Sequence, residues 1–162
     1  MSPQSSFDSA KYRQVLGHFT TGVTVITAAG ESGPVGLAVG SFSSVSLDPP
    51  LVGFFADQGS TSWPKIEATG SFCVNILGEQ QEDVCRRFAS KGDDKFAGLG
   101  WSPAGSGSPL LAGVIAWIDC DIDSVVPAGD HVLVLGAVRE LEVAHDGPPL
   151  AFFRGGYGRF LV

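Results

Sequence analysis

Apolar residues near the start of the chain recur with the spacing of a helix. The residues that keep this spacing are Tyr12, Val15, Leu16 and Phe19. Asp8 precedes them in the position of an N-cap, where a carboxylate accepts a hydrogen bond from a free backbone N–H. The pattern predicts a first helix that begins after Asp8 and ends between residues 17 and 22.

The period of the apolar residues then changes to two, which is the spacing of a strand with one buried face. Residues 22–28 and 35–42 both alternate in this way. The stretch "AGESGP" lies between them and carries the glycine and proline of a turn. The two runs are therefore expected to form a hairpin.

The stretch "SFSSVSLDPPLVGFF" (41–55) places hydroxyl side chains among strand-forming residues. The Ser43-Ser44 step breaks the alternation, which indicates a β-bulge. Asp48-Pro49-Pro50 is expected to end the strand, because a proline has no N–H to donate to a sheet. Residues 51–56 are then predicted to return as a buried strand.

The rest of the chain adds further strands and two helices. The stretch "STSWPKIE" predicts a short helix near Pro64, and residues 79–90 predict another with the inner stripe Val84, Cys85, Phe88 and Ala89. Strand patterns are "SFCVNIL" (71–77), "VIAWIDCDID" (114–123), "HVLVLGAVRELEV" (131–143) and "LAFF" (150–153). The segment 91–113 is the longest irregular stretch, and a loop of this length in a small domain is more often functional than not.

Six or seven strands with two or three short helices and no alternating β-α-β pattern predict a mainly β fold. The expected architecture is a closed or nearly closed antiparallel barrel, in which closure removes exposed sheet edges. A chain of 162 residues fits one domain with a core of ordinary size. We expect a single domain over residues 1–162, with residues 1–8 as a flexible N-terminus.

Composition narrows the class of protein. The net charge of −7 and the pI near 4.7 argue against general binding to nucleic acid or to anionic membranes. The three cysteines are odd in number, widely spaced and set among apolar residues, which favours buried free thiols and a reducing cytoplasm. The N-terminus lacks the pattern of a secretory signal, and no apolar run approaches the ~20 residues that span a bilayer. A soluble, cytoplasmic protein is expected.

Motifs of catalytic machinery are missing from the sequence. There is no G-x-S-x-G, P-loop or H-E-x-x-H, and no G-x-G-x-x-G between a strand and a helix. The three histidines are far apart, so no metal site is expected. On the 114–123 strand, Ala116, Ile118, Cys120 and Ile122 are predicted to face inward, while Trp117, Asp119, Asp121 and Asp123 face the other way as a solvated surface. With no candidate nucleophile or acid–base pair, the chain fits a binding protein or an enzyme whose cofactor carries the reaction.

An ordered set of sequence blocks resembles the short-chain flavin reductase family. The blocks are "RQVLGHFTTGVTVIT", "PVGLAVGSFSSVSLDPPLVGFF", "STSW", "GSFCVNIL", "VCRRFASKGDDKF", "GDHVLVLGAV" and "PLAFFRGGY". The resemblance implies an antiparallel Greek-key split barrel (the FMN-binding split barrel) that assembles as a homodimer. It also implies that the protein reduces FAD or FMN with NADH or NADPH and passes the reduced flavin to a separate monooxygenase.

The same resemblance implies two groups of cofactor-binding residues. The flavin contacts fall on Pro34, Val35, Gly36, Leu37, Ala38, Gly40, Ser41, Phe55, Ala56, Asp57, Thr61, Ser62, Arg87 and Phe88. The contacts to the nicotinamide nucleotide fall on His131, Phe152, Phe153, Arg154 and Gly155. No residue is implied as a nucleophile or as an acid–base catalyst, because hydride passes directly between the two cofactors.

Physical chemistry supports several of these positions and leaves alternatives for others. Small residues such as Gly36 allow a flat ring to approach a strand backbone, although the glycine equally relieves crowding at a barrel corner. Thr61 and Ser62 offer hydroxyls for a phosphate, with Arg87 as the cation, unless Arg87 only forms the solvated face of its helix. The alternatives for the whole protein are a flavin-storage module without turnover and an oxidase similar to those acting on pyridoxamine phosphate.

Overall fold

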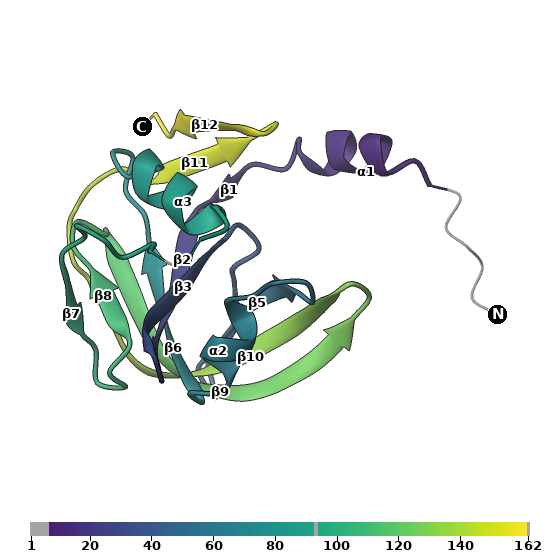
Figure 1. The fold of residues 1–162 in the computed structure, drawn as a ribbon. Helices are drawn as coiled ribbons and strands as arrows, with labels where there is room; N and C mark the ends of the chain where they lie inside the picture. The colour runs from purple at the N-terminus through teal and green to yellow at the C-terminus, as the bar shows by residue number, and fades with distance from the viewer. Residues whose placement is uncertain (1–6, 93, 162) are drawn as a thin grey trace.

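The computed structural model describes residues 7–92 and 94–161, and within them the chain is mainly β (Figure 1). The helices are α1 (Ser9–Leu16), α2 (Trp63–Glu67) and α3 (Glu82–Ala89). The strands are β1 (Thr21–Gly22), β2 (Thr24–Gly30), β3 (Gly33–Val39), β4 (Ser43–Ser46), β5 (Leu51–Asp57), β6 (Ser71–Ile76), β7 (Trp101–Pro103), β8 (Pro109–Leu111), β9 (Ala116–Ala128), β10 (His131–Val143), β11 (Leu150–Phe153) and β12 (Gly156–Arg159). Six of the residues expected to form a flexible N-terminus, 1–6, lie outside the described part of the chain.

A seven-stranded antiparallel sheet forms the body, in the order β3-β2-β6-β9-β10-β5-β4. Side chains from both ends of this order, such as Val39 on β3 and Phe54 on β5, meet in one buried cluster with Phe72 and Val134. The sheet therefore curls around a single core, as the strand patterns predict. Among the described residues no strand pairing joins β3 to β4, so the sheet is not closed by hydrogen bonds and the closed form of the predicted barrel is not found.

The bulge and the turn predicted for residues 41–55 are both present. The pairing of β4 with β5 shifts register between Ser44 and Ser46, which leaves Val45 as the extra residue. The Asp48–Pro49 peptide bond is cis within the turn that follows. These features bring β5 back antiparallel to β4 and carry its end toward the β9–β10 turn.

The outer face of the sheet is covered by a second layer, which corrects two sequence expectations. The segment 91–113 is not irregular throughout, because it contains the hairpin of β7 and β8. Asp119, predicted to lie on a solvated face, has an exposed fraction of 0%. Its carboxylate accepts hydrogen bonds from the Ser106 hydroxyl at 2.6 Å and the Ser106 N–H at 2.9 Å. Alternation assigned the correct face, but the segment that covers it lies elsewhere in the sequence.

Asn75 is the second buried polar group under this layer. Its amide nitrogen lies 3.1 Å from the Thr27 hydroxyl and 3.3 Å from the Pro109 carbonyl oxygen, and its carbonyl oxygen accepts from the Leu111 N–H at 2.9 Å. The Thr27 hydroxyl donates to the same Pro109 carbonyl at 2.6 Å. These bonds attach β8 to the two strands beneath it.

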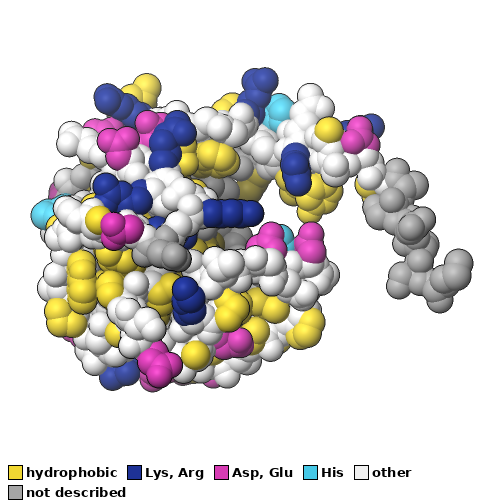
Figure 2. Space-filling view, viewed as in Figure 1, with side chains coloured by type: hydrophobic (Ala, Val, Ile, Leu, Met, Phe, Trp, Pro, Cys, Tyr) yellow, Lys and Arg dark blue, Asp and Glu magenta, His cyan; other side chains and the backbone are white. Residues whose placement is uncertain are grey.

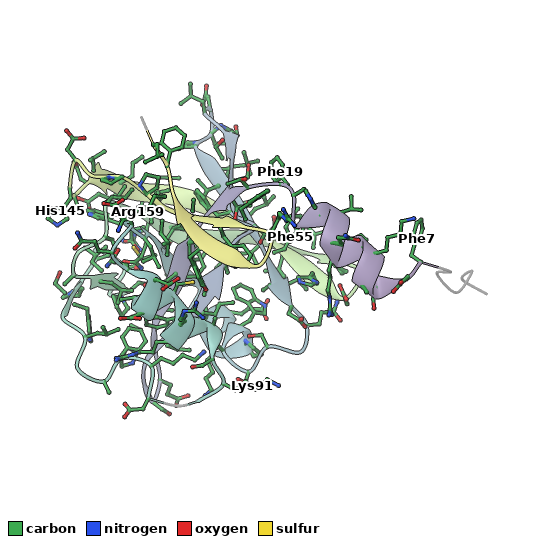
Figure 3. The ribbon with its side chains drawn as sticks, turned by 90° about the horizontal axis from the view of Figure 1, so that it is seen from above. Phe7, Phe19, Phe55, Lys91, His145 and Arg159 are labelled. Carbon is green, nitrogen blue, oxygen red and sulfur yellow. The ribbon has the colours of Figure 1, made fainter. Side chains whose placement is uncertain are left out.

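Helix α1 projects from the body as an arm (Figures 1 and 3). Its predicted N-cap is confirmed, because the Asp8 carboxylate accepts from the Ala10 N–H at 2.9 Å. Within the described part of the chain, α1 buries none of its residues, and Phe19 just beyond it is 78% exposed. The arm joins the body through the small sheet β1-β11-β12 and through the Arg154 N–H, which donates to the Gly17 carbonyl at 2.8 Å.

All three cysteines are free and buried, which confirms the prediction. Burial raises the pKa of the Cys120 thiol to about 12 and also raises the pKa of the Cys73 and Cys85 thiols. The thiols therefore stay protonated and pack as small apolar groups. No helix in the described ranges is long and apolar enough to cross a membrane.

Replacing Asn75 with Ala should lower the free energy of unfolding by about 2–3 kcal/mol, because the buried Leu111 N–H loses its acceptor and the Pro109 carbonyl keeps only the Thr27 hydroxyl. Urea denaturation measures the change, and Asp146→Ala, a substitution at an exposed loop position, is the control. Equal stability of the two variants would show that β8 is held without this side chain.

Candidate functional site

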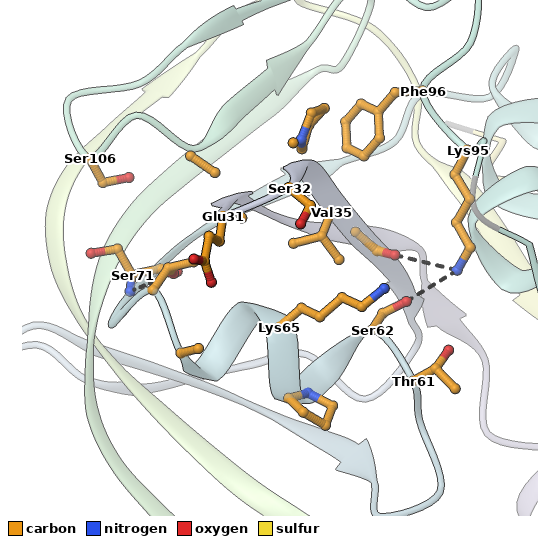
Figure 4. A pocket seen from close by; sticks show the side chains of 18 of the residues that line it. Glu31, Ser32, Val35, Thr61, Ser62, Lys65, Ser71, Lys95, Phe96 and Ser106 are labelled. Carbon is orange, nitrogen blue, oxygen red and sulfur yellow. Dashed lines mark hydrogen bonds between the residues drawn. The ribbon is translucent and has the colours of Figure 1, made fainter.

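A pocket of about 870 Å³ lies between the β2–β3 hairpin, α2 and the loop after α3 (Figure 4). Its walls combine small residues, hydroxyls and two lysines. The lining residues include Gly30, Glu31, Ser32, Pro34, Val35, Gly36, Thr61, Ser62, Lys65, Ala68, Thr69, Ser71, Lys95, Phe96 and Ser106. Its size and concave shape are those of a small-molecule site.

Lys95 supplies the charge at one end of the pocket. Its ammonium lies 3.2 Å from the Phe88 carbonyl oxygen and 3.4 Å from both the Gly36 carbonyl oxygen and the Ser62 hydroxyl. Burial lowers the pKa of Lys95, and the nearby Lys65 ammonium lowers it further. In the described chain Lys95 forms no ion pair with a carboxylate, so its charge is available to an anion.

The hydroxyls of Thr61 and Ser62 are not needed to cap α2, because Ser60 accepts hydrogen bonds from the backbone N–H groups at the start of this helix. The Ser60 hydroxyl accepts from the Trp63 N–H at 3.1 Å and from the Ser62 N–H at 3.2 Å. Trp63 is buried and packs edge-on against Phe54, which fixes α2 on the core. The hydroxyls of Thr61 and Ser62 are thus left on the pocket wall beside Lys95 (Figure 4).

Gly36 lies where α3 packs most closely against β3. A Cβ added at this position would lie 2.8 Å from Cε1 of Phe88 and 3.1 Å from the Ile26 carbonyl oxygen. Phe88 is buried behind the strand, in contact with Phe96 at 5.0 Å between ring centroids. This packing gives Gly36 a structural reason to be glycine, whatever the pocket binds.

Arg87 lies outside the pocket lining, although the sequence favours it as the cation. Its guanidinium donates to the Ala97 carbonyl, which ties α3 to the following loop. Leu37 and Ala38 point into the two apolar clusters, and Gly40 follows the end of β3. Of the predicted flavin residues, the pocket brings together five: Pro34, Val35, Gly36, Thr61 and Ser62.

A second group of predicted residues lies where the end of β5 pairs with the start of β10. Asp57 is opposite His131, and the His131 ring nitrogen Nδ1 lies 2.7 Å from the Asp130 carboxylate. That hydrogen bond and the histidine charge lower the pKa of Asp130. Figure 2 shows a cleft between this acidic rim and the α1 arm.

The Ser41 hydroxyl holds the backbone of β5 at Phe55, close to the end of this strand. Its hydroxyl accepts from the Phe55 N–H at 3.0 Å and lies 3.3 Å from the Phe55 carbonyl oxygen. The Phe55 side chain is 42% exposed, whereas Ala56 is buried. The hydroxyl expected to contact a ligand is therefore engaged with the neighbouring strand.

The third group forms the turn between β11 and β12. Arg154 and Gly155 have φ angles of 53° and 76°, the conformation of a two-residue hairpin turn with both φ positive. Phe153 packs edge-on against His18 at 6.0 Å between ring centroids, and Phe152 packs against Tyr157 at 5.3 Å. The turn is thus held against the end of α1.

Sequence reasoning missed the two lysines and Phe96 on the pocket wall. Lys95 lies in the irregular stretch "SKGDDKF", where no periodicity indicates the direction of a side chain. The only available signal was the position of this stretch inside one of the quoted blocks. The positive charge at the pocket comes from Lys95 in a loop and Lys65 on α2, rather than from Arg87 on α3, which the sequence favoured.

Comparisons with known proteins agree on one family. The model of the flavin reductase like domain matches residues 16–161. The chain is 56% identical over 158 residues to a flavin reductase of Pseudomonas putida, covering 97% of this chain and 93% of that protein. It is 51% identical over 155 residues to the reductase subunit HsaB of a flavin-dependent monooxygenase of Mycobacterium tuberculosis, covering 94% and 83% of the two chains.

Solved structures give the same result. A homolog of nitrilotriacetate monooxygenase component B from Mycobacterium thermoresistibile superimposes with a TM-score of 0.93 at 47% identity, covering 98% of this chain and 89% of that one. The Streptomyces globisporus NADH:FAD oxidoreductase SgcE6, in complex with NAD and FAD fragments, has a TM-score of 0.90 at 36% identity, with coverages of 95% and 93%.

Replacing Gly36 with Ala should destabilise the fold by about 1–3 kcal/mol, because the new methyl group displaces Phe88. Gly22→Ala is the matched control, since nothing lies within 4 Å of a Cβ at that position. Denaturant unfolding of both variants measures the difference. A Gly36 variant as stable as the Gly22 variant would show that α3 adjusts without cost.

Proposed function

This chain belongs to the flavin reductase-like family, and from that premise we propose that the pocket at Lys95 holds the phosphate end of a flavin. The protein is an NAD(P)H-dependent flavin oxidoreductase. The observation that supports the site is the Lys95 ammonium beside the Ser62 hydroxyl in a concave pocket. A cation and a hydroxyl are the groups that bind a phosphate.

The residues present fit a flavin. Lys95, Ser62 and Thr61 would hold the phosphate, and the β3 backbone around Pro34–Gly36 forms the adjoining wall. Further proposed flavin contacts, at Leu37, Ala38, Gly40, Ser41 and Phe55–Asp57, continue from that wall toward the cleft beneath α1. The half-exposed Phe55 ring would provide an apolar surface there.

The bound flavin supplies the redox chemistry, because it accepts a hydride from NAD(P)H and a proton from solvent while NAD(P)H is oxidised to NAD(P)⁺. The protein's part is to align the two rings and to exclude water. This division explains why the chain needs no nucleophile or acid–base pair.

The nicotinamide nucleotide is proposed to bind across the cleft, at His131 and at the β11–β12 turn. His131 is half-buried, so part of its side chain is exposed to a ligand. The turn residues are Phe153, Arg154 and Gly155, and Phe152 packs beneath them. The Arg154 guanidinium, 5.9 Å from the Phe153 ring centroid, offers a positive charge to the nucleotide phosphates.

Reduced flavin is the product that leaves the enzyme. Relatives are named reductase subunits of flavin-dependent monooxygenases, so a separate monooxygenase is the partner that consumes the product. A storage module would bind flavin without oxidising NADH, and an oxidase similar to those acting on pyridoxamine phosphate would not need NADH. Turnover with NADH distinguishes the reductase from both alternatives.

A homodimer of Greek-key split barrels is proposed as the assembled form. An exposed, largely apolar stripe on α1 and just after it consists of Tyr12, Val15, Leu16 and Phe19. An apolar helix face that the described part of its own chain leaves exposed is typical of an interface. A second copy placed on this arm would also cover the open side of the cleft.

Purified protein mixed with FMN and NADH under anaerobic conditions should bleach the flavin absorbance. Lys95→Ala should weaken FMN binding about 10- to 100-fold, which corresponds to the loss of ~1.5–3 kcal/mol for a charge-assisted hydrogen bond. Riboflavin, which lacks the phosphate, should bind both proteins equally. Fluorescence titration gives the dissociation constants.

Arg87→Ala is the comparison for this measurement. A larger loss of FMN affinity in the Arg87 variant would restore Arg87 as the phosphate cation. Persistent flavin colour with NADH in the unmodified protein would contradict the reductase function and favour storage.

Replacing Leu16 with Glu should weaken the dimer at least about 10-fold, because a charge would be buried in the proposed interface. Gln14→Glu adds the same charge to the opposite side of α1 and is the matched control. Sedimentation velocity over a dilution series measures both. Dimers of equal strength would place the interface elsewhere, and a monomeric unmodified protein would exclude the homodimer.

A further inference from the structure

The names of similar proteins include both FMN and FAD as the flavin, so family membership leaves the choice open for this chain. FAD differs from FMN by an added AMP unit, that is, a second phosphate and an adenosine. The question for the structure is whether the site continues beyond the first phosphate. The inference below rests on the proposed function, since it assumes that the flavin phosphate lies at Lys95.

The pocket extends well past Lys95 and Ser62 (Figure 4). It runs along α2, from Thr61 before the helix to Thr69 after it, and ends near Ser71 and Ser106. The five residues of α2 alone correspond to a helical rise of about 7.5 Å. A single phosphate at the Lys95 end would use only one end of the 870 Å³ volume.

A second positive charge lies along this extension. Lys65 on α2 lines the pocket, and its proximity to Lys95 is one cause of the lowered pKa of Lys95. Within residues 7–92 and 94–161 neither lysine forms an ion pair. Two ammonium groups that repel each other without a carboxylate between them match two linked phosphates better than one.

The far end has the chemistry of a nucleoside site. Ala29, Gly30 and Ala68 keep it open, and the Glu31 carboxylate can accept hydrogen bonds from ribose hydroxyls. Phe96 lines the same pocket on the side of Lys95 rather than at this end (Figure 4), with its ring fixed by edge contacts to Phe88 at 5.0 Å and Trp101 at 6.4 Å.

We propose that this extension binds the AMP part of FAD, with Lys65 on the second phosphate, and that the protein therefore prefers FAD to FMN. Lys65 is then a specificity-determining residue for the flavin. The same AMP chemistry occurs in NADH, but the extension is continuous with the Thr61–Ser62–Lys95 end assigned to the flavin phosphate. FAD is thus the ligand whose two parts occupy one uninterrupted pocket.

Fluorescence titration of the full chain with FAD, FMN and riboflavin tests this proposal. The unmodified protein should bind FAD at least about 10-fold more tightly than FMN, the factor expected for one added charge-assisted contact. Lys65→Ala should weaken FAD binding about 10-fold and FMN binding less than about 2-fold. Lys91→Ala removes the same charge from an exposed residue outside the pocket and should change neither value.

A steric variant tests the far end without altering charge. Ala68 is exposed on the pocket wall, so Ala68→Trp should fold normally and block the nucleoside. FAD binding should weaken toward that of FMN, whereas FMN binding and the Michaelis constant for NADH should stay unchanged.

The outcomes separate this inference from the proposed function. Equal affinity for FAD and FMN in the unmodified protein, or equal losses for both flavins in Lys65→Ala, would overturn the FAD preference while leaving flavin reduction intact. If Lys65→Ala or Ala68→Trp raised the Michaelis constant for NADH and left the affinity for FAD unchanged, the extension would be assigned to the electron donor. Failure to bind any of the three flavins would overturn the proposed function itself.

Discussion

The attachment of residues 99–113 to the outer face of the sheet is the constraint on which the site depends. Asn75 and Asp119 are buried polar groups, and each would be costly to bury without its partners on this segment. Once they are satisfied, Phe96 and Ser106 are held near the β2–β3 hairpin and become pocket wall. The same layer buries Phe88, whose contact with Gly36 sets how closely α3 approaches β3. Packing on the outer face and the shape of the pocket therefore have a common origin.

The strands and the turns of this fold were predictable because they leave local signals. Alternation located β2, β3 and β6, the prolines after Asp48 located the turn before β5, and the apolar run after them located β5 itself. Alternation does not show whether another segment covers a face. Asp119 was therefore assigned to the correct side of β9 but to solvent, because its cover, at Ser106, lies in the stretch 91–113 that was predicted to be irregular.

Residues of the pocket wall were predicted only where they lie in or beside a regular element within a block that resembles the flavin reductase family. Thr61 and Ser62 precede the helix that starts near Pro64, and Gly36 lies in a strand. Lys95 lies in a loop whose direction depends on contacts with the carbonyl groups of Gly36 and Phe88. The Gly36 carbonyl lies on β3, which is distant in sequence, and the Phe88 carbonyl lies on the preceding helix. Three-dimensional packing alone therefore identifies Lys95 rather than Arg87 as the pocket cation.

The net charge of the chain makes this local arrangement of lysines necessary. At −7, the overall field of the protein repels flavin phosphates and nucleotides, so affinity has to come from short-range contacts in a partly desolvated pocket. This arrangement has a cost, because the Lys95 ammonium loses part of its hydration when it is buried. The loss lowers the pKa of Lys95. A bound phosphate would restore the lost solvation and favour the charged lysine. The acidic surface and the half-buried lysine thus have complementary effects, since the surface disfavours nonspecific anions while the pocket offers a positive charge to an anion that fits.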